Sequence, residues 1–211
     1  MFSSRIDAGR RLGQELTKRQ VRADLILGVP RGGMVVAYEI AKILKLPLDA
    51  LVVKKLGAPH NPELAIGALT YDDVTYIDTD LVRNLEISKE YIKQEIRRKH
   101  HEFRDRDLLL RKNKPSIVVR GKQVIVADDG VATGATLFAA LEWLHKKEAK
   151  KIIVAIPVAT RLTVYRIRNA VDKCVILEEP DNFGAVGEFY SDFRQVMDEE
   201  VVSLLNSRLP K

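Results

Sequence analysis

The stretch VIVADDGVATGAT, residues 124–136, is the part of this sequence that decides the fold. It begins with a short, β-branched apolar run that predicts a buried strand, and the strand ends in two adjacent carboxylates, Asp128 and Asp129. A loop of small residues with two threonines follows, and the apolar run over residues 137–144 starts a helix whose positive end points into that loop. Small residues let main-chain N–H groups approach a phosphate closely. The stretch therefore predicts a site for an anion.

The paired acids predict that this anion is carried by a sugar. Carboxylates repel a phosphate, but they accept hydrogen bonds from vicinal hydroxyl groups. The order of acid, acid and phosphate loop matches a ribose 5-phosphate, with Asp128 and Asp129 on the 2- and 3-hydroxyls. An ordinary strand–turn–helix junction would not need two acids followed by four small residues and two threonines.

In these thirteen residues the sequence resembles the type I phosphoribosyltransferases, whose signature is a hydrophobic strand, two acids and a Gly/Thr-rich loop. The resemblance implies that Asp128 and Asp129 bind the ribose of phosphoribosyl diphosphate. It also implies that the loop holds the 5-phosphate, through Gly130, Val131, Ala132, Thr133, Gly134, Ala135 and Thr136.

Length and composition favour one domain of a cytoplasmic protein. The 211 residues can bury a sizeable core, and no stretch approaches the roughly 18 apolar residues of a membrane span. The single cysteine, Cys174, can form neither an internal disulfide nor a cysteine-rich metal site. The net charge of +6 suits a polyanionic small molecule, and it suits nucleic acid equally well.

The order of expected elements predicts the α/β class, with a parallel central sheet flanked by helices. Strand, helix and strand joined by right-handed crossovers place ligands at the carboxyl ends of the strands. We expect helices over residues 4–20, 34–46 and 161–169, and strands over residues 24–29, 48–53, 64–70, 74–77, 152–156 and 173–177.

The resemblance implies a single domain of 211 residues with a core at about 21–178. It implies a small hood over the sheet, built from about 1–20 and 179–211. A highly charged helical insertion at about 78–113 is longer than in compact members of the family, and its role does not follow from the sequence.

The turn GVPRGG ends the strand expected over residues 24–29. Arg31 supplies a fixed cation, and Gly32 and Gly33 free main-chain amides to turn toward an anion, although an ordinary turn with a solvated arginine has the same residues. In the resembled family this turn binds the diphosphate. In that family a basic residue after the next strand also reaches the diphosphate. Lys54 and Lys55 both stand at this position, and the sequence does not show which of them has the role.

Residues 57–63 are polar and interrupted by proline and glycine, which predicts a long irregular loop. The family has a mobile loop at this point that closes over the substrate. His60, Asn61 and Glu63 are therefore candidates for contacts that form on closure.

Aromatic residues after the last expected strand suit a planar base, because rings stack on it. Phe183, Val186 and Gly187 resemble the base-binding element of hypoxanthine-guanine phosphoribosyltransferases, although the same aromatics can form a small core within the hood. At the position of Ala132 the 6-oxopurine enzymes have an aspartate. The alanine at this position resembles adenine-type members of the family instead. The acceptor therefore stays open, with Glu63, Glu188 or Asp192 as alternative acids.

The implied activity is transfer of the phosphoribosyl group to a nitrogen acceptor, such as a nucleobase, with release of diphosphate. Asp128, Asp129, Lys54 and Lys55 would serve catalysis, and Mg²⁺ would bind mainly through the substrate, near the two acids. We expect a homodimer with no membrane partner and no nucleic acid partner. The alternative is a regulator that senses phosphoribosyl diphosphate and binds RNA or DNA.

Overall fold

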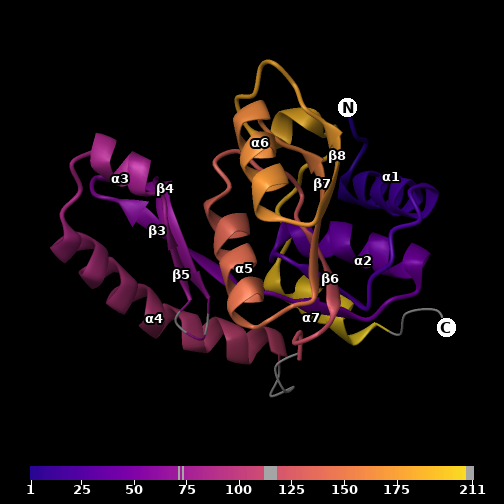
Figure 1. The fold of residues 1–211 in the computed structure, drawn as a ribbon, viewed down its shortest axis with the longest axis horizontal. Coiled ribbons are helices and arrows are strands. Elements are labelled where there is room, and N and C mark those ends of the chain that lie inside the picture. Colours follow the sequence, from indigo (N-terminus) through magenta and orange to yellow (C-terminus); the bar gives the residue numbers. More distant parts are fainter. Residues whose placement is uncertain (71, 73, 112–117, 208–211) are drawn as a thin grey trace.

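The chain folds around a five-stranded parallel sheet, as the sequence predicts (Figure 1). The computed structural model describes residues 1–70, 72, 74–111 and 118–207, apart from the side chains of Glu63 and residues 101–111. The strand order is β2-β1-β6-β7-β8, and all neighbouring pairs are parallel. These strands are β1 (Leu25–Gly28), β2 (Leu48–Ala50), β6 (Gln123–Ala127), β7 (Lys151–Val158) and β8 (Lys173–Glu178).

Helices cover both faces of this sheet, because its strands bury apolar side chains on both sides. The alternation along β6 shows the division: Val124 and Val126 pack with one core, Ile125 and Ala127 with the other. The first core includes residues of α5 (Ala135–Lys146) and α6 (Arg161–Ala170), and the second includes residues of α1 (Arg5–Lys18) and α2 (Gly32–Leu44).

A second sheet forms a separate lobe beside α5, which the sequence analysis did not predict (Figure 1). It is antiparallel, with the order β3-β4-β5. Its elements and the helices that follow it are β3 (Val53–Ala58), β4 (Asn61–Thr70), β5 (Thr75–Ile77), α3 (Thr79–Asn84) and α4 (Lys89–Arg111). Helix α5 therefore packs against the parallel sheet on one side and against the lobe on the other.

Two expectations about this region are wrong. The strand expected over residues 48–53 is two strands in different sheets, because the chain leaves the parallel sheet after Ala50. The irregular loop expected over residues 57–63 is the tip of a β-hairpin. His60 makes the tight turn with a positive φ of 63°, and register shifts on both sides of Gly57 accommodate the irregular residues that suggested a loop.

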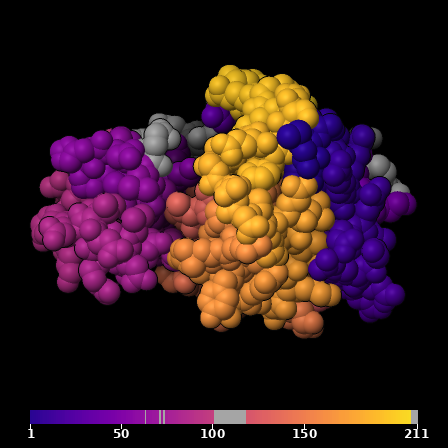
Figure 2. All heavy atoms as spheres, turned by 90° about the horizontal axis from the view of Figure 1, so that it is seen from above, coloured from indigo at the N-terminus to yellow at the C-terminus, as the bar shows by residue number. Residues whose placement is uncertain are grey.

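The N-terminal residues meet the segment around Tyr190 near the carboxyl edge of the parallel sheet. Phe2 pairs in parallel with Tyr190, just after the short 3₁₀ helix η1 (Val186–Phe189). Figure 2 shows the N-terminal residues, in indigo, against the yellow C-terminal segment. The last helix, α7 (Asp198–Asn206), packs on α2 and α4. The division into core, insertion and hood stays a prediction, and residues 112–113 of the insertion and 208–211 of the hood lie outside the described residues.

Candidate functional site

Two loops meet at the carboxyl edge of the parallel sheet, because β1 and β6 are neighbours. Gly28 pairs with Ala127, and the Val29 N–H donates to the Ala127 carbonyl at 3.0 Å. Beyond these residues β1 continues into the turn at 30–33, in which the Pro30-Arg31 peptide bond is cis, and β6 continues into the two acids. The structure thus brings the GVPRGG turn and the acid pair side by side.

The glycines of the turn are needed for this approach. A Cβ atom on Gly33 would lie 2.7 Å from Asp128 Oδ1, and one on Gly32 would lie 1.8 Å from Asp129 Oδ2. No side chain fits at either place without moving the acids. The side chain of the neighbouring Arg31 has no hydrogen bond or ion pair with the described residues, so its guanidinium is available to an incoming anion.

Asp128 is a buried carboxyl group with a perturbed pKa. Its side chain accepts the N–H of Asp129 at 2.8 Å, and only 9% of the residue is exposed. Burial raises the pKa of Asp128 well above its usual value, and the neighbouring Asp129 charge raises it further. The positive charge of Lys55 lowers the same pKa. A buried carboxyl of this kind is typical of functional sites.

Asp129 is held from both sides by residues that the sequence analysis missed. Arg5 Nε lies 2.6 Å from Asp129 Oδ2, and the two side chains are 11% and 16% exposed. The Tyr190 hydroxyl donates to the Asp129 main-chain carbonyl at 2.5 Å. Burial raises the pKa of Tyr190, and the Asp129 charge adds to it, so the phenol stays protonated and donates.

One signal in the sequence points to Arg5. A cation in the first turn of a helix is unfavourable, because the N-terminal end of the helix dipole is positive. Arg5 is the first residue of α1, after the N-cap Ser4. An arginine placed against the dipole indicates a partner elsewhere in the chain, although the sequence does not identify Asp129 as that partner.

The loop over residues 130–136 is fixed by its main chain and leaves an open helix end. The Val131 N–H donates to the Val158 carbonyl at 2.9 Å. Gly134 has a φ of 84° and precedes α5, and no side chain caps this helix terminus. Thr133 is exposed, and Thr136 is half-buried. Free N–H groups at a helix N-terminus are a favourable place for a phosphate.

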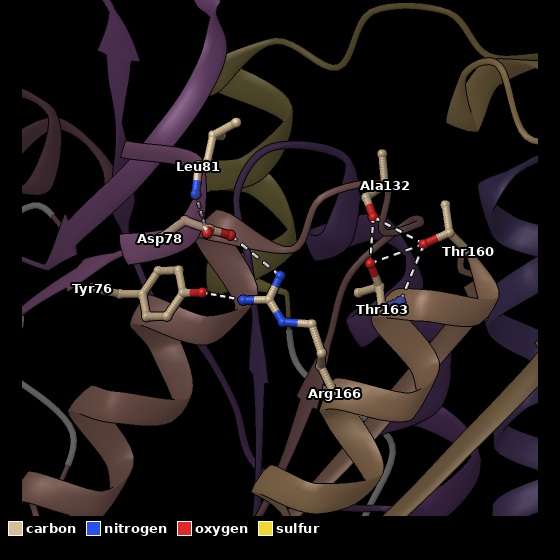
Figure 3. A network of polar contacts seen from close by, with 7 residues as sticks. All are labelled: Tyr76, Asp78, Leu81, Ala132, Thr160, Thr163 and Arg166. Atoms are coloured by element: carbon tan, nitrogen blue, oxygen red, sulfur yellow. Dashed lines mark hydrogen bonds and ion pairs between the residues drawn. The ribbon is translucent and has the colours of Figure 1, made fainter. Parts of the chain in front are cut away.

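The same loop is held by two threonines of the α6 terminus (Figure 3). Thr163 donates its hydroxyl proton to the Ala132 carbonyl at 2.6 Å, and the Thr160 hydroxyl lies 3.3 Å from that carbonyl. Ala132 itself is exposed. The conformation of the loop therefore depends on α6, which no local pattern within residues 124–136 reveals.

One turn further along α6, Arg166 connects the antiparallel lobe to the core (Figure 3). It donates to the Tyr76 hydroxyl and, at 3.3 Å, to Asp78, whose other carboxylate oxygen caps α3 through Leu81 N–H. Its guanidinium also lies 4.5 Å from the centre of the Phe138 ring on α5. These contacts fix the lobe relative to the helix that follows the phosphate loop.

Lys54 and Lys55 belong to β3 in the antiparallel lobe, whereas we expected them at the edge of the parallel sheet. Lys55 is exposed, and it is the one whose charge acts on Asp128. Lys54 is half-buried and has contacts of its own. Their catalytic roles stay predictions.

The hairpin that replaces the expected loop is held by α4. The Tyr91 hydroxyl donates to the Gly57 carbonyl at 3.0 Å, and the Gly57 N–H donates to buried Glu95 at 3.5 Å. Arg98 in turn pairs with Glu95 at 2.7 Å. Two neighbouring turns of α4 therefore bind the irregular position of the hairpin. This contact gives the charged helical segment a structural role.

The lid residues lie at the far end of this hairpin, where His60 and Asn61 are exposed. The side chain of Glu63 lies outside the described residues. A closing movement of this tip stays a prediction, and it would be a movement of a hairpin instead of a flexible loop.

The three base-binding candidates lie close to the phosphate loop. A Cβ atom on Gly130 would lie 2.4 Å from Val186, so the C-terminal segment packs directly on the loop. Phe183 is half-buried and stacks with Phe189, with ring centres 5.1 Å apart. A Cβ atom on Gly187 would lie 2.9 Å from the Phe193 ring. Phe183 and Gly187 thus each pack against another ring of the C-terminal segment.

A metal ion would find two carboxylates here. Within the described residues, no group of three or more histidine, cysteine, aspartate or glutamate side chains could hold a metal ion. The acid pair offers the oxygen ligands that Mg²⁺ prefers, but burial raises the pKa of Asp128 and Asp129 is paired with Arg5. The residues therefore fit a magnesium ion that is held mainly by its substrate. In the same described part of the chain, no helix is both long and apolar enough for a membrane span.

Comparisons with known proteins agree with this geometry. The family model of the phosphoribosyl transferase domain matches residues 4–194. Two Mycobacterium tuberculosis proteins, MT0597 of strain CDC 1551 and Rv0571c of strain H37Rv, bear the provisional name of phosphoribosyl transferase. Each is 39% identical over 206 residues, which cover 98% of this chain and 46% of the relative, so the chain spans about half the length of these relatives. The crystal structure of TT1426 from Thermus thermophilus is similar at 37% identity and a TM-score of 0.82, and the match covers 97% of both chains.

Proposed function

The chain belongs to the phosphoribosyl transferase domain family, and from this premise we propose that it moves the 5-phosphoribosyl group of phosphoribosyl diphosphate to a nucleobase nitrogen. The family membership confirms the resemblance carried by residues 124–136. One observation carries the proposal for the reaction: the acid pair, the glycine turn and the open end of α5 converge at one edge of the sheet.

In the proposed reaction the bond between C1 of the ribose and the diphosphate oxygen breaks, and a bond from C1 to the acceptor nitrogen forms. The diphosphate leaves with the bonding electrons, and the nitrogen gives up its proton. Catalysis is mostly positioning and stabilisation of charge. In this reaction Asp129 would stabilise the positive charge that grows on the ribose ring, and Arg31 and Lys55 would stabilise the leaving diphosphate.

Mg²⁺ is the proposed cofactor. Held mainly by its substrate, near Asp128 and Asp129, it would neutralise negative charge on the diphosphate. The two acids would accept hydrogen bonds from the ribose hydroxyls, and the amides of residues 130–136 would hold the 5-phosphate.

The acceptor stays open between purine and pyrimidine classes. Ala132 supplies no carboxylate in the phosphate loop, so the proton of the acceptor must go to another group or to water. Glu188 and Asp192 are exposed acids of the C-terminal segment, where they bind the N–H groups of Gly184 and Arg194. Either side chain can turn to an acceptor, because both lie at the surface.

The test is a screen of nucleobases and simple analogues for diphosphate release in the presence of Mg²⁺. We expect release with one base class only. Phe183→Ala should then weaken acceptor binding far more than sugar binding, because in this proposal the ring contacts only the base. Absence of diphosphate release with every base would reject the transferase.

The second candidate is a regulator that binds nucleic acid, and one feature favours it. A pocket of about 340 Å³ opens at the amino-terminal edge of the sheet, opposite the acids, and Arg22, Lys151 and Lys173 line it. None of the three has an ion-pair partner in the part of the chain that the structure describes. RNA binding that falls steeply with salt, together with no diphosphate release, would favour this candidate over the enzyme.

We further propose a cytoplasmic homodimer. Leu162 and Tyr165 support an interface, because they lie one turn apart on α6 and are 71% and 67% exposed. Light scattering of the purified chain measures the oligomeric state, and a monomer at all concentrations would reject the dimer.

A further inference from the structure

Arg5 makes three contacts that join the N-terminal residues and the segment at 193–194 to the acid pair. Its Nε donates to Asp129 Oδ2 at 2.6 Å, and a terminal guanidinium nitrogen donates to the Arg194 carbonyl at 2.8 Å. Its guanidinium carbon lies 3.7 Å from the centre of the Phe193 ring. It also lies over the glycine turn, since a Cβ atom on Gly32 would be 2.6 Å from Arg5 Nε. The side chain is 11% exposed, so little water competes for these bonds.

The position of Arg5 lowers the stability of α1, but it allows Arg5 to contact the acid pair. As the first residue of that helix it opposes the dipole, which a surface residue would have no reason to do. Arginine also differs from lysine in having a planar fork that can stack on a ring and donate in two directions. The Arg5 guanidinium uses both properties, because it stacks on the Phe193 ring and donates to Asp129 Oδ2 and to the Arg194 carbonyl.

The ion pair with Arg5 fixes the Asp129 carboxylate but engages only one of its two oxygens. Only Oδ2 takes part in the pair, so Oδ1 can accept a further hydrogen bond. The main chain of the same residue is held by Tyr190, whose ring packs against Phe193 with centres 5.0 Å apart. The backbone and side chain of Asp129 are therefore both oriented by the C-terminal segment, one directly and the other through Arg5.

We propose that Arg5 is a positioning residue that couples residues 190–194, which contact the base-binding candidate Gly187 through Phe193, to the ribose acid Asp129, an inference that rests on the proposed function. A base that orders the Phe193 region also orders Arg5, and Arg5 then presents Asp129 Oδ1 to a ribose hydroxyl. Sugar binding and acceptor binding strengthen each other through this one side chain. The coupling is reciprocal, because it is a free energy shared by two sites.

The experiment uses ribose 5-phosphate, which carries the hydroxyls and the 5-phosphate but cannot react. Calorimetry measures its affinity for the full chain and for Arg5→Met, Asp129→Asn and the double variant. We expect Arg5→Met to weaken binding about tenfold, the typical loss for a hydrogen bond to a charged group, and to have less than about a twofold effect when Asp129 is already asparagine. Arg5→Lys should recover part of the loss, and Phe193→Leu should weaken binding in the same direction.

Arg11→Met is the matched control. Arg11 lies on the same helix, pairs with Asp7 at 2.8 Å and lies 5.3 Å from the Phe2 ring, but it does not contact Asp129. We expect it to leave ribose 5-phosphate affinity unchanged. Thermal melting of each variant separates loss of fold from loss of affinity, and the milder Arg5→Lys and Phe193→Leu changes keep the test valid if Arg5→Met does not fold.

Two results would overturn the proposal while leaving the enzyme intact: tighter binding by Arg5→Met, or an equal loss with and without the Asp129 carboxylate. Ribose 5-phosphate binding without diphosphate release would instead reject the transferase, whereas a loss on Arg5→Met that depends on the Asp129 carboxylate would still support the link between Arg5 and Asp129. Failure of the unchanged protein to bind ribose 5-phosphate would reject the ribose assignment and this coupling together.

Discussion

The Tyr190 hydroxyl lies 2.5 Å from the main-chain carbonyl of Asp129, so a phenol of the C-terminal segment holds the backbone of the acid pair. Tyr190→Phe keeps the ring stack but leaves that carbonyl without its donor. We expect a loss of about 1–3 kcal/mol in the free energy of unfolding, the usual cost of an unsatisfied buried group. Chemical denaturation measures it. Tyr165→Phe is the control, because that hydroxyl belongs to a side chain that is 67% exposed, and an equal effect of both changes would reject the role of the bond.

Asp128→Asn should change how stability depends on pH. Burial raises the pKa of folded Asp128 above the value of about 3.9 expected in the unfolded chain. A raised carboxyl pKa means that the fold favours the protonated group, so its contribution is full below about pH 4 and is lost as the pH rises through the folded pKa. Asparagine cannot ionise and keeps an oxygen for the Asp129 N–H. The variant should therefore gain in melting temperature relative to the parent between pH 4 and pH 8, and a constant difference would contradict the burial argument.

Thr163→Val should weaken the phosphate loop more than the fold. The change removes the 2.6 Å hydrogen bond to the Ala132 carbonyl and keeps the shape of a side chain that is 2% exposed. We expect a three- to tenfold loss of ribose 5-phosphate affinity, which corresponds to about 1 kcal/mol for one hydrogen bond. Thr17→Val removes a similar bond, from the Thr17 hydroxyl to the Gly13 carbonyl on α1. If both variants bind equally well, the α6 contact does not shape the loop.

Tyr91→Phe should loosen the hairpin. The Tyr91 hydroxyl donates to the Gly57 carbonyl at 3.0 Å, at the position where the strand register shifts. Loss of about 1 kcal/mol should speed amide exchange around Gly57 roughly fivefold, if local opening governs exchange there. Hydrogen exchange detected by NMR measures this. Tyr38→Phe, on α2, should leave these amides unchanged; unaltered exchange at Gly57 in the Tyr91 variant would show that α4 does not restrain the hairpin.

The sequence predicted the parallel sheet and the acid pair because their signals are local. A buried strand, two acids and a small-residue loop are consecutive in residues 124–136, and the Gly32 and Gly33 turn follows its strand directly. The side-by-side placement of these two loops follows from the strand order. The site residues themselves remain predictions, which the experiments above address.

The antiparallel lobe was missed because its signals conflict. Proline and glycine at residues 57–63 indicate a loop by composition, yet the bulge at Gly57 and the left-handed His60 turn allow a continuous hairpin. The contact that stabilises this hairpin comes from Tyr91 and Glu95, more than 30 residues later. Arg5 was missed for the same reason, because its partner Asp129 is 124 residues away.

The pairing of residues 2–5 with residues 190–194 sets the earliest point in synthesis at which Asp129 can be held from both sides. Arg5 meets the Arg194 carbonyl across 189 residues, and Phe2, which is 1% exposed in the folded protein, lies against Tyr190. A ribosome adding about 5–20 residues per second therefore makes all strands of the parallel sheet before Phe2 can pair with Tyr190 and before Arg5 can reach the Arg194 carbonyl. Until then the Phe2 ring lacks the aromatic partner that it packs against in the folded protein. A nascent chain that stalls after β8 would therefore carry the parallel sheet without the Tyr190 bond to the Asp129 carbonyl.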